Sequence, residues 1–487
     1  MREVVFIEND LMCHPPRSSL KGGGVTAENN NNMDLEAIKR FYFIGIGGIG
    51  MSALARYFFA RGYDVAGYDK TPSPLTDELI AEGMHVHFDD LGENVPAAFK
   101  DVASTLVVYT PAIPRGMQEL LYFQQGHQVL KRSEVLGLIT QSGKGIGVAG
   151  THGKTTTSTM LAYVLSQSHV KCSAFLGGIS SNFNSNVIID ADSEISVIEA
   201  DEFDRSFLRL SPFASIITAM DPDHLDIYGT EEAFREAFQQ YADKQHADGF
   251  VITKYGLPLA SSSRQITYGI NTPAADYQGI NLRSTDGHFF FDLKGPGVDW
   301  KAIGLGLPGI HNCENAVAVC AMCIELGLTK EEILSGLKTF KGVKRRFEYH
   351  VRTEELVYID DYAHHPTEIA ALIDSVRMLY PTRHITGIFQ PHLFSRTRDF
   401  MPGFISELSR LDKTILMPIY PAREEPIEGI TSDVLLKEIT ADKQLLTPGE
   451  VLEWAKKITS GVILTIGAGD IDRIVPKLEE QLKANLS

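Results

Sequence analysis

The chain has 487 residues, a length that predicts about three domains. Hydrophobic residues make up 44% of the chain and charged residues 22%, which is ordinary for a globular protein that folds without disulfide or metal support. With 45 Lys and Arg against 62 Asp and Glu, the net charge is −17, which argues against a broad nucleic-acid-binding surface and against binding to anionic membranes.

The first 32 residues predict a disordered leader. They carry PPRSS, KGGG and ENNNN, and they lack the basic start and apolar stretch of a signal peptide. Met33 directly precedes the first credible helix-and-strand pattern, so we expect either that Met33 is the natural start or that 1–32 is a flexible tail. Truncation to Met33 should then leave activity and melting temperature nearly unchanged.

The cellular setting follows from two further features. The sequence contains no run of about 18 apolar residues, which excludes a transmembrane helix. Its five cysteines are scattered and odd in number, which suits a reducing cytoplasm. Cys320 and Cys323 form a CxxC, but they stand in an apolar helical pattern without a second ligand pair, and they predict packed core thiols rather than zinc.

Strands that alternate with helices predict three α/β domains built on parallel βαβ units. We place the first domain at 33–140, the second at 141–342 and the third at 343–487. The first and third are expected to be Rossmann-like, and the second to carry a mixed sheet with a small antiparallel insert at 264–300. The expected strands outside that insert are 41–46, 63–69, 104–110, 144–150, 195–201, 213–221, 355–363, 384–391, 413–421 and 461–470.

A glycine-rich turn, GIGGIG, follows the first strand. It matches G-x-G-x-x-G, in which glycines let the backbone approach a phosphate and the next helix offers oriented N–H donors. Asp69 ends the second strand, where a Rossmann acid would contact a ribose hydroxyl. The motif predicts a nucleotide diphosphate, as in nicotinamide or flavin enzymes, and a tight turn without a ligand is the alternative. The expected binding residues are Gly45, Gly47, Gly48, Gly50 and Asp69.

A second loop, GTHGKTT, follows the strand at 144–150 and precedes the helix at 155–167. Backbone N–H groups of such a loop cradle phosphates, while Lys154 would reach the β/γ-phosphates and Thr155 would place a hydroxyl on Mg²⁺. Val148 stands where the full Walker pattern has a glycine, so only the GKT core matches. The expected triphosphate-binding residues are Gly150, Thr151, His152, Gly153, Lys154, Thr155 and Thr156.

Potential metal ligands close the next two strands. Glu199, Asp201 and Glu202 close the strand at 195–201, and the segment DPDHLD, which contains Asp221 and His224, follows the next strand. Carboxylates at strand ends beside a phosphate-binding loop are suited to Mg²⁺, and a histidine nitrogen is compatible with Mg²⁺ or, more readily, Mn²⁺. Solvated loop residues are the alternative interpretation.

Polar residues at three later positions add to the candidate site. Asn312 and Asn315 begin a helix, where they would either cap it or bind an adenine edge. Arg346 would neutralise charge that develops during phosphoryl transfer. The remaining candidates for an acidic substrate, carboxylate or phosphate are His364, His365, His392 and Arg396. A helix-start turn at His365 and a solvated basic face around Arg396 are the alternatives.

The order of these motifs resembles the Mur ligase family over about residues 40–475. The matching segments are GIGGIGMSALA, GTHGKTT, EADEFDRSF, DHLD, HNxxNA, RRFE, DDYAHHPTE and FQPHxxSRTRDF. The resemblance implies a UDP-sugar domain, a central ATPase domain and a C-terminal amino-acid domain. The first glycine loop would then hold the diphosphate of UDP rather than a dinucleotide.

The resemblance also implies roles for individual residues. Lys154 and Thr155 would bind ATP phosphates and Mg²⁺, Glu199 would hold the metal between them, and His224 would bind a second ion. Asn312 and Asn315 would lie by the nucleotide, and Arg346 and Asp361 would contact ATP. His364 or His365, with Arg396, would position the amino acid. The sequence departs from the family pattern at Leu393, Phe394 and Ser395, where Arg, Tyr and Thr are usual.

The implied activity is ATP-dependent joining of L-alanine to the carboxylate of UDP-N-acetylmuramate through an acyl phosphate, in peptidoglycan precursor synthesis. The alternative within the family is the recycling ligase that attaches a tripeptide to the same UDP-sugar, against which FQPHLFSRTRDF favours alanine. A dinucleotide-dependent oxidoreductase would leave the GKT loop unexplained, and a nucleotide-binding regulator would leave the metal and arginine residues idle. The expected assembly is a monomer or weak homodimer.

Overall fold

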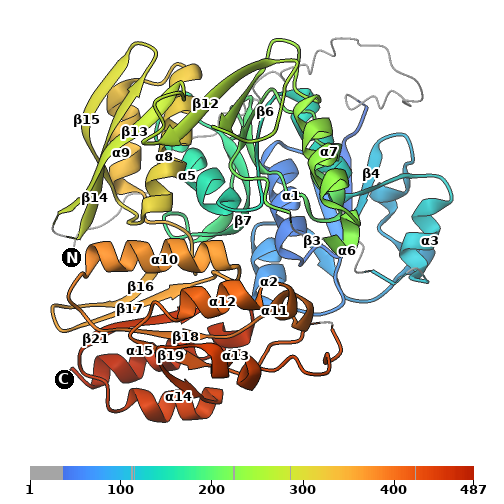
Figure 1. Ribbon diagram of the computed structural model, residues 1–487. Helices are drawn as coiled ribbons and strands as arrows, with labels where there is room; N and C mark the ends of the chain where they lie inside the picture. The colour runs from blue at the N-terminus through green and yellow to red at the C-terminus, as the bar shows by residue number, and fades with distance from the viewer. Residues whose placement is uncertain are drawn as a thin grey trace, which may run out of the picture. The chain divides into compact units, whose positions relative to one another are not determined.

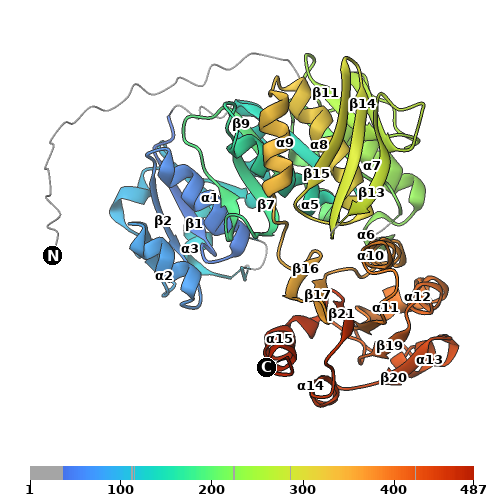
Figure 2. The same ribbon diagram turned by 90° about the vertical axis from the view of Figure 1, so that its left-hand side faces the viewer.

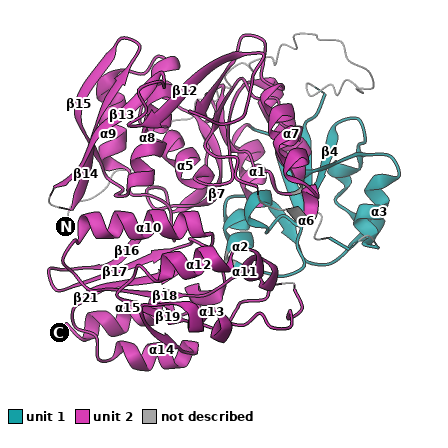
Figure 3. Cartoon of the chain, in the orientation of Figure 1, with its two compact units in different colours: residues 1–51, 62–131 teal, residues 52–61, 132–487 magenta. Residues whose placement is uncertain are grey.

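The computed structural model describes residues 37–486, apart from 111, 112, 115, 223, 224, 286 and 423 and the side chains of 74, 204, 225 and 226. The predicted leader at 1–32 therefore lies outside the described residues. The chain divides into two compact units, which Figure 3 colours separately. The first unit comprises residues 1–51 and 62–131, and the second comprises 52–61 and 132–487.

The first unit is built on a parallel sheet of five strands in the order β3-β2-β1-β4-β5. This is the expected Rossmann-like arrangement, in which β1 lies at the centre between β2 and β4. Its side chains pack in a core that includes Tyr42, Val107 and Phe123. The strands are β1 (Arg40–Ile44), β2 (Asp64–Tyr68), β3 (His85–His87), β4 (Thr105–Tyr109) and β5 (Gln128–Lys131). The helices are α2 (Pro74–Ala81) and α3 (Gln118–Gln124), while α1 (Ile49–Ala60) contributes to both units.

The second unit begins with a sheet of ten strands in the order β15-β14-β13-β12-β11-β10-β6-β9-β7-β8. The sheet is mixed, as predicted, because β13, β14 and β15 form antiparallel hairpins at one edge and β8 pairs antiparallel with β7 at the other. Its strands are β6 (Lys144–Ala149), β7 (Ser173–Ser180), β8 (Ser185–Ile188), β9 (Ile195–Glu199), β10 (Ala214–Ile217), β11 (Phe250–Lys254), β12 (Arg264–Ile270), β13 (Tyr277–Thr285), β14 (His288–Gly295) and β15 (Val298–Leu305).

Two predictions for this sheet can be compared with the structure. The antiparallel insert was expected from residue 264, but β12 is parallel to β11 and belongs to the main sheet. The prediction was wrong for β12 because a parallel strand near a sheet edge and a strand of a hairpin show the same alternation of apolar and polar residues. The prediction of packed thiols is confirmed, because Cys320 and Cys323 are buried and burial raises the pKa of Cys320 to about 12.

Two helices of this sheet, α5 and α9, pack against α8, which is apolar and mostly buried. Figure 1 shows α5 and α8 lying against the sheet, and Figure 2 shows α9 beside β15. The helices are α4 (Arg132–Ser142), α5 (Lys154–Ser166), α6 (Leu225–Tyr228), α7 (Glu231–Ala242), α8 (Ile310–Glu325) and α9 (Lys330–Thr339). No helix in the described part of the chain has the length and hydrophobicity that a membrane span needs.

The same unit ends with a sheet of six strands in the order β16-β17-β21-β18-β19-β20, parallel except for β16. The segments that follow the carboxyl ends of β17 and β18 contribute residues to the candidate site. The strands are β16 (Glu348–Arg352), β17 (Leu356–Asp361), β18 (Ile385–Phe389), β19 (Lys413–Leu416), β20 (Asp442–Leu445) and β21 (Gly461–Ile466). The helices are α10 (Pro366–Leu379), α11 (Phe394–Asp399), α12 (Met401–Leu408), α13 (Ser432–Glu438), α14 (Pro448–Ala455) and α15 (Val475–Ala484).

Each sheet falls within one of the three segments that the sequence predicted as domains, and the α/β fold class is confirmed. The boundaries at residues 140 and 342 stay predictions, since the compact units group the second and third segments together.

Candidate active site

A polar cavity of about 140 Å³ lies in the second unit. Its wall comes from the loop between β6 and α5, from the region after β9, and from three segments of the C-terminal sheet. The lining residues are Thr151, Gly153, Lys154, Thr155, Thr156, Glu199, Glu202, Arg346, His364, Glu368 and Arg396. The structure thus brings together residues from five of the motifs singled out in the sequence.

The loop before α5 has the geometry of a phosphate cradle. Gly150 and Gly153 have φ angles of +132° and +81°, which favour glycine. A Cβ atom on Gly150 would lie 2.2 Å from Oγ1 of Thr218, so a side chain there would push the loop out of place. Gly153 occupies the N-cap of α5 without a side-chain cap, which leaves the N–H groups of the first turn oriented toward an anion. The arrangement fits the phosphates of a nucleotide.

Lys154 is bound by Glu202, which the sequence indicated only as one of several strand-end carboxylates. Its Nζ donates to the carbonyl of Gly150 at 2.8 Å and forms an ion pair with Oε2 of Glu202 at 2.7 Å. Burial opposes the charge of Lys154, but the carboxylates of Glu202 and Asp201 outweigh burial and raise its pKa, so the amine is a cation at neutral pH. The segment EADEF contains Glu202, but nothing in its spacing distinguishes it from its acidic neighbours.

The predicted metal ligands Thr155 and Glu199 are adjacent. Oγ1 of Thr155 donates to Oε1 of Glu199 at 2.9 Å, and Oε2 of Glu199 accepts from the backbone N–H of Gly177 at 2.8 Å. A hydroxyl and an oriented carboxylate are the hard oxygen donors that Mg²⁺ prefers, so the two residues fit this ion. The third predicted ligand, His224, lies outside the described residues.

The two asparagines lie on α8 and are buried. Asn312 was expected to cap this helix or to bind a base, but Gly309 occupies the cap and Asn312 donates back to the carbonyl of Pro308 at 2.6 Å. The cap prediction failed because the N-cap of the helix, Gly309, lies three residues before Asn312. Asn315 lies beside the phosphate-type loop, where its Oδ1 is 3.0 Å from the point that a Cβ of Gly153 would take. An adenine contact stays a prediction for both residues.

Arg346 enters the cavity from the segment before β16, and its guanidinium lies 4.8 Å from the ring centre of Tyr362. Asp361 does not line the cavity. Its carboxylate accepts from the backbone N–H of Phe347 at 2.7 Å and of Ala363 at 2.8 Å. Burial raises the pKa of Asp361 to about 6, although the nearby charge of Arg346 opposes this. Asp361 therefore fixes the backbone next to Arg346, and its predicted contact with ATP stays untested.

The structure gives the two adjacent histidines different positions. His364 lines the cavity, and burial, which outweighs the opposing charge of Glu368, lowers its pKa. The side chain of His365 instead caps α10, accepting from the N–H of Thr367 at 3.3 Å. Its ring centre lies 5.0 Å from that of His152 and 4.5 Å from that of Phe400.

His392 lies on the segment between β18 and α11, and Arg396 lies on α11 itself. Burial, reinforced by the charge of Arg396, lowers the pKa of His392 to about 4, so its ring is neutral near pH 7. Arg396 lines the cavity, and the ring of His392 stacks on Tyr420. Leu393, which departs from the family pattern, has φ +69° and ψ 139°, a conformation that L side chains rarely adopt. Its carbonyl accepts from both the N–H and the hydroxyl of Thr397.

The predicted diphosphate loop belongs to the first unit and follows β1. The N–H of Gly47 donates to Oδ2 of Asp69 at 2.8 Å, and Gly45 has φ +89°. A Cβ on Gly47 would lie 2.9 Å from the same carboxylate oxygen, so glycine is needed for the close approach of Asp69. Gly48 and Gly50 lie in the same turn and at the start of α1. Here Asp69 holds the loop itself, and its contact with a ribose stays a prediction.

Comparison with known proteins identifies the family. Three family models match in order, described as Mur ligase family catalytic domain over 40–144, Mur ligase middle domain over 148–323, and Mur ligase glutamate ligase domain over 345–474. A UDP-N-acetylmuramate–L-alanine ligase of Porphyromonas gingivalis is 50% identical over 453 residues, which cover 92% of this chain and 99% of that protein. The chain belongs to the Mur ligase family. A protein of the same description from Phocaeicola vulgatus is 49% identical to this Mur ligase, over 92% of this chain and 98% of that protein.

Solved structures agree with the assignment. The crystal structure of a UDP-N-acetylmuramate–alanine ligase from Thermotoga maritima matches this Mur ligase with a TM-score of 0.71 and 28% identity, over 91% of this chain and 99% of that one. A murein peptide ligase from Psychrobacter arcticus matches with a TM-score of 0.60 and 22% identity, over 91% and 98%, and this likeness shows the shared fold alone.

Proposed function

We propose that this Mur ligase joins L-alanine to the carboxylate of UDP-N-acetylmuramate at the expense of ATP, in the cytoplasm and as a step of peptidoglycan precursor synthesis. The observation that carries the proposal is the 50% identity, over 99% of its length, with a protein described as UDP-N-acetylmuramate–L-alanine ligase. The cavity supports it, because a phosphate-type loop, oxygen ligands for Mg²⁺ and two arginines line the same space.

The chemical need for such a cavity follows from the substrate. A carboxylate is a poor acyl donor, and phosphorylation by ATP converts one of its oxygens into a leaving group. The acyl phosphate then reacts with the neutral amine of alanine, an amide forms, and inorganic phosphate leaves with the oxygen. The γ-phosphoryl group carries its charge on three oxygens, so catalysis depends on cations and donors that are already in position.

The proposed roles use the geometry of this chain. The cationic amine of Lys154, held by Glu202 in the structure, turns to the phosphate oxygens. Thr155 and Glu199 hold Mg²⁺, with His224 as the proposed ligand of a second ion, either Mg²⁺ or Mn²⁺. Arg346 neutralises the transferring phosphoryl group. His364 and Arg396, with His392 nearby, bind the alanine, and His364 is favoured over His365 because only His364 lines the cavity.

The remaining assignments concern the two nucleotides. Gly150, Thr151, His152, Gly153 and Thr156 contribute backbone or hydroxyl groups to the ATP phosphates, with Asn312, Asn315 and Asp361 at the edge of that site. In the first unit, the loop Gly45, Gly47, Gly48 and Gly50 binds the diphosphate of the UDP-sugar, and Asp69 contacts its ribose. The glycine geometry of both loops supports these assignments.

Phosphate release from ATP, with Mg²⁺ and UDP-N-acetylmuramate and with the amine varied, tests the proposal. Release that requires L-alanine, with UDP-N-acetylmuramoyl-L-alanine detected by mass, is the expected result. Release with the tripeptide but not with alanine would instead assign the chain to the recycling ligases. If neither amine supports release, the proposed activity is wrong.

A further inference from the structure

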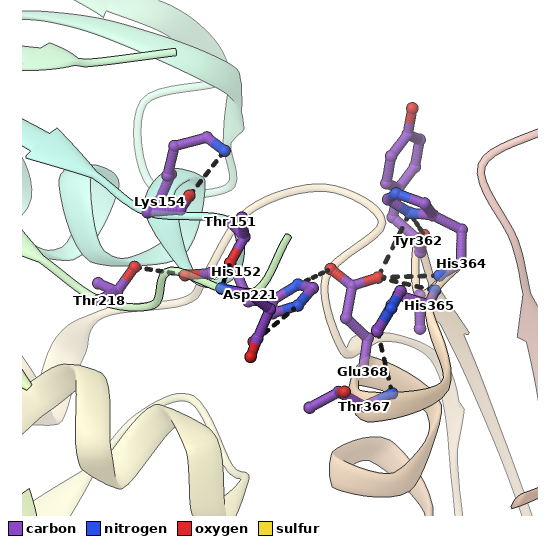
Figure 4. Close-up of polar contacts among 12 residues, drawn as sticks. Thr151, His152, Lys154, Thr218, Asp221, Tyr362, His364, His365, Thr367 and Glu368 are labelled. Carbon is purple, nitrogen blue, oxygen red and sulfur yellow. Dashed lines mark hydrogen bonds and ion pairs between the residues drawn. The ribbon is translucent and has the colours of Figure 1, made fainter. Parts of the chain in front are cut away.

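The imidazole of His152 does not face the cavity. Its loop neighbours Thr151 and Gly153 line the cavity, whereas His152 does not. The backbone carbonyl of His152 accepts from the hydroxyl of Thr218, which fixes the backbone, while the ring extends toward Glu368 on α10 (Figure 4). A histidine in a phosphate-type loop that extends away from the phosphate site calls for a separate explanation.

The ring of His152 lies between the carboxylates of Asp221 and Glu368 (Figure 4). Nε2 is 3.4 Å from Oδ2 of Asp221, which follows β10, and Nδ1 is 3.3 Å from Oε1 of Glu368, on α10. The side chain of His152 is only 18% exposed. Burial alone would lower its pKa, but the two acids outweigh burial and raise the pKa to about 9, so the ring is a cation at neutral pH.

Glu368 connects the contact with His152 to the start of α10. Its second oxygen, Oε2, accepts from the N–H groups of His364 at 2.9 Å and His365 at 3.3 Å, which forms the capping box of α10. The carboxylate of Glu368 is therefore shared between the loop on one side of the cavity and the start of α10 on the other. Because a buried carboxylate is costly without a counter-charge, the two elements stabilise each other.

We propose that His152 is a positioning residue, whose charged ring joins Asp221 to Glu368 and thereby holds His364 and the start of α10 against the phosphate-type loop. The amino-acid half of the cavity is then kept in register with the nucleotide half by one ionic bridge. This inference rests on the proposed function for its kinetic consequence, but its structural consequence can be tested separately.

The test uses substitutions that keep hydrogen bonding and remove charge. His152→Gln removes the cation, and Glu368→Gln removes the anion while its amide oxygen still accepts the capping N–H groups. His152→Lys restores a cation. His169→Gln is the matched control, because Nδ1 of His169 lies 2.9 Å from Oε1 of Glu332 in an ion pair whose histidine is 61% exposed.

The kinetic readout is the turnover of the ligation reaction. We expect His152→Gln and Glu368→Gln each to lower kcat by about tenfold or more, while KM for ATP changes less than about threefold, because the loop backbone is unaltered. The double variant should lose no more than either single variant, since both remove the same interaction. His152→Lys should recover most of the loss. The proposal would be overturned if the two losses of kcat multiplied in the double variant. It would also be overturned if His152→Lys were as slow as His152→Gln.

Hydrogen exchange of the ligand-free protein provides the second readout and needs no activity. We expect amide protection in the first turn of α10 to fall by about tenfold or more in His152→Gln and to be unchanged in His169→Gln. Unchanged protection in His152→Gln would refute the bridge even if ligation is confirmed. Conversely, lost protection in a chain without ligation activity would refute the proposed function and leave the bridge established.

Discussion

The buried ion pair between Lys154 and Glu202 leads to a prediction that separates stability from activity. The side chains of Lys154 and Glu202 are 14% and 1% exposed, and their charged atoms are 2.7 Å apart. Removing one partner of a buried pair leaves an uncompensated charge and costs about 3–5 kcal/mol. Lys154→Met should therefore destabilise the segment around the ten-stranded sheet by this amount, in addition to removing the proposed phosphate ligand.

A second substitution should restore most of the lost stability but none of the lost activity. In Lys154→Met with Glu202→Gln, both charges are gone, and the loss of stability should shrink to about 1 kcal/mol because neutral groups replace a desolvated pair. Turnover should stay at least about a hundredfold below wild type in both variants, because both lack the cation that we propose stabilises the phosphoryl oxygens.

The two tryptophans of the chain make the measurement specific. Trp300 lies on β15 and Trp454 on α14, so Trp454→Phe leaves Trp300 to report urea unfolding of the segment that contains Lys154. Lys254→Met is the control, since Lys254 forms a 2.9 Å pair with Glu314 in which the lysine is 41% exposed. Such a pair contributes about 0–1 kcal/mol. If Lys154→Met costs no more than this control, or if Glu202→Gln restores nothing, the reasoning is refuted.

Three further predictions concern other parts of the molecule. Gly177→Ala places a Cβ 2.3 Å from the carboxylate of Glu199. The Mg²⁺ concentration for half-maximal phosphate release should therefore rise about tenfold or more. An unchanged magnesium titration would contradict the assignment of Glu199. Tyr42→Phe removes the hydroxyl that donates to buried Glu119 at 2.8 Å. The substitution should lower the free energy of unfolding, measured by thermal unfolding, by about 1–3 kcal/mol. An equal loss in the control Tyr122→Phe would show that the effect is nonspecific. Burial, together with the charge of Arg346, lowers the pKa of His311 to about 4, so the folded chain resists protonation that the unfolded chain accepts below its ordinary pKa of 6.5. Stability should thus fall as pH drops from about 6.5 to 4, and His311→Gln should lose about 3 kcal/mol less over that window; parallel curves would exclude this role.

Features whose geometry is set within one short segment could be predicted from the sequence. The glycines at 150 and 153, followed by Lys154 and Thr155, predicted a cradle at the start of a helix because backbone conformation and helix N-terminus are both set within seven residues. Strand ends in parallel sheets meet at one edge, which is why Glu199 could be placed beside Thr155 before the structure was known.

Interactions between distant segments could not be predicted in the same way. Glu202 lies 48 residues from Lys154, and Glu368 lies 216 residues from His152, and neither spacing carries a signal. The roles of His364 and His365 were undecided because they depend on which ring faces the cavity, and this is set by the capping box at Glu368. The parallel course of β12 was missed because its pairing with β11 is a tertiary choice that residue alternation does not encode.

The backbone of Leu393 has a consequence for how this enzyme could change over evolutionary time. A non-glycine residue in such a conformation costs about 1–3 kcal/mol, which the surrounding hydrogen bonds to Thr397 and Tyr420 must offset. A mutation to glycine would relieve that strain, so stability alone would favour losing the leucine. The turn at Leu393 also sets the orientation of the Arg396 side chain on α11. A more flexible backbone there would make the position of the guanidinium less fixed. If Arg396 binds the amino acid as proposed, Leu393→Gly would raise thermal stability and lower activity, so the two properties would respond to this one position in opposite directions.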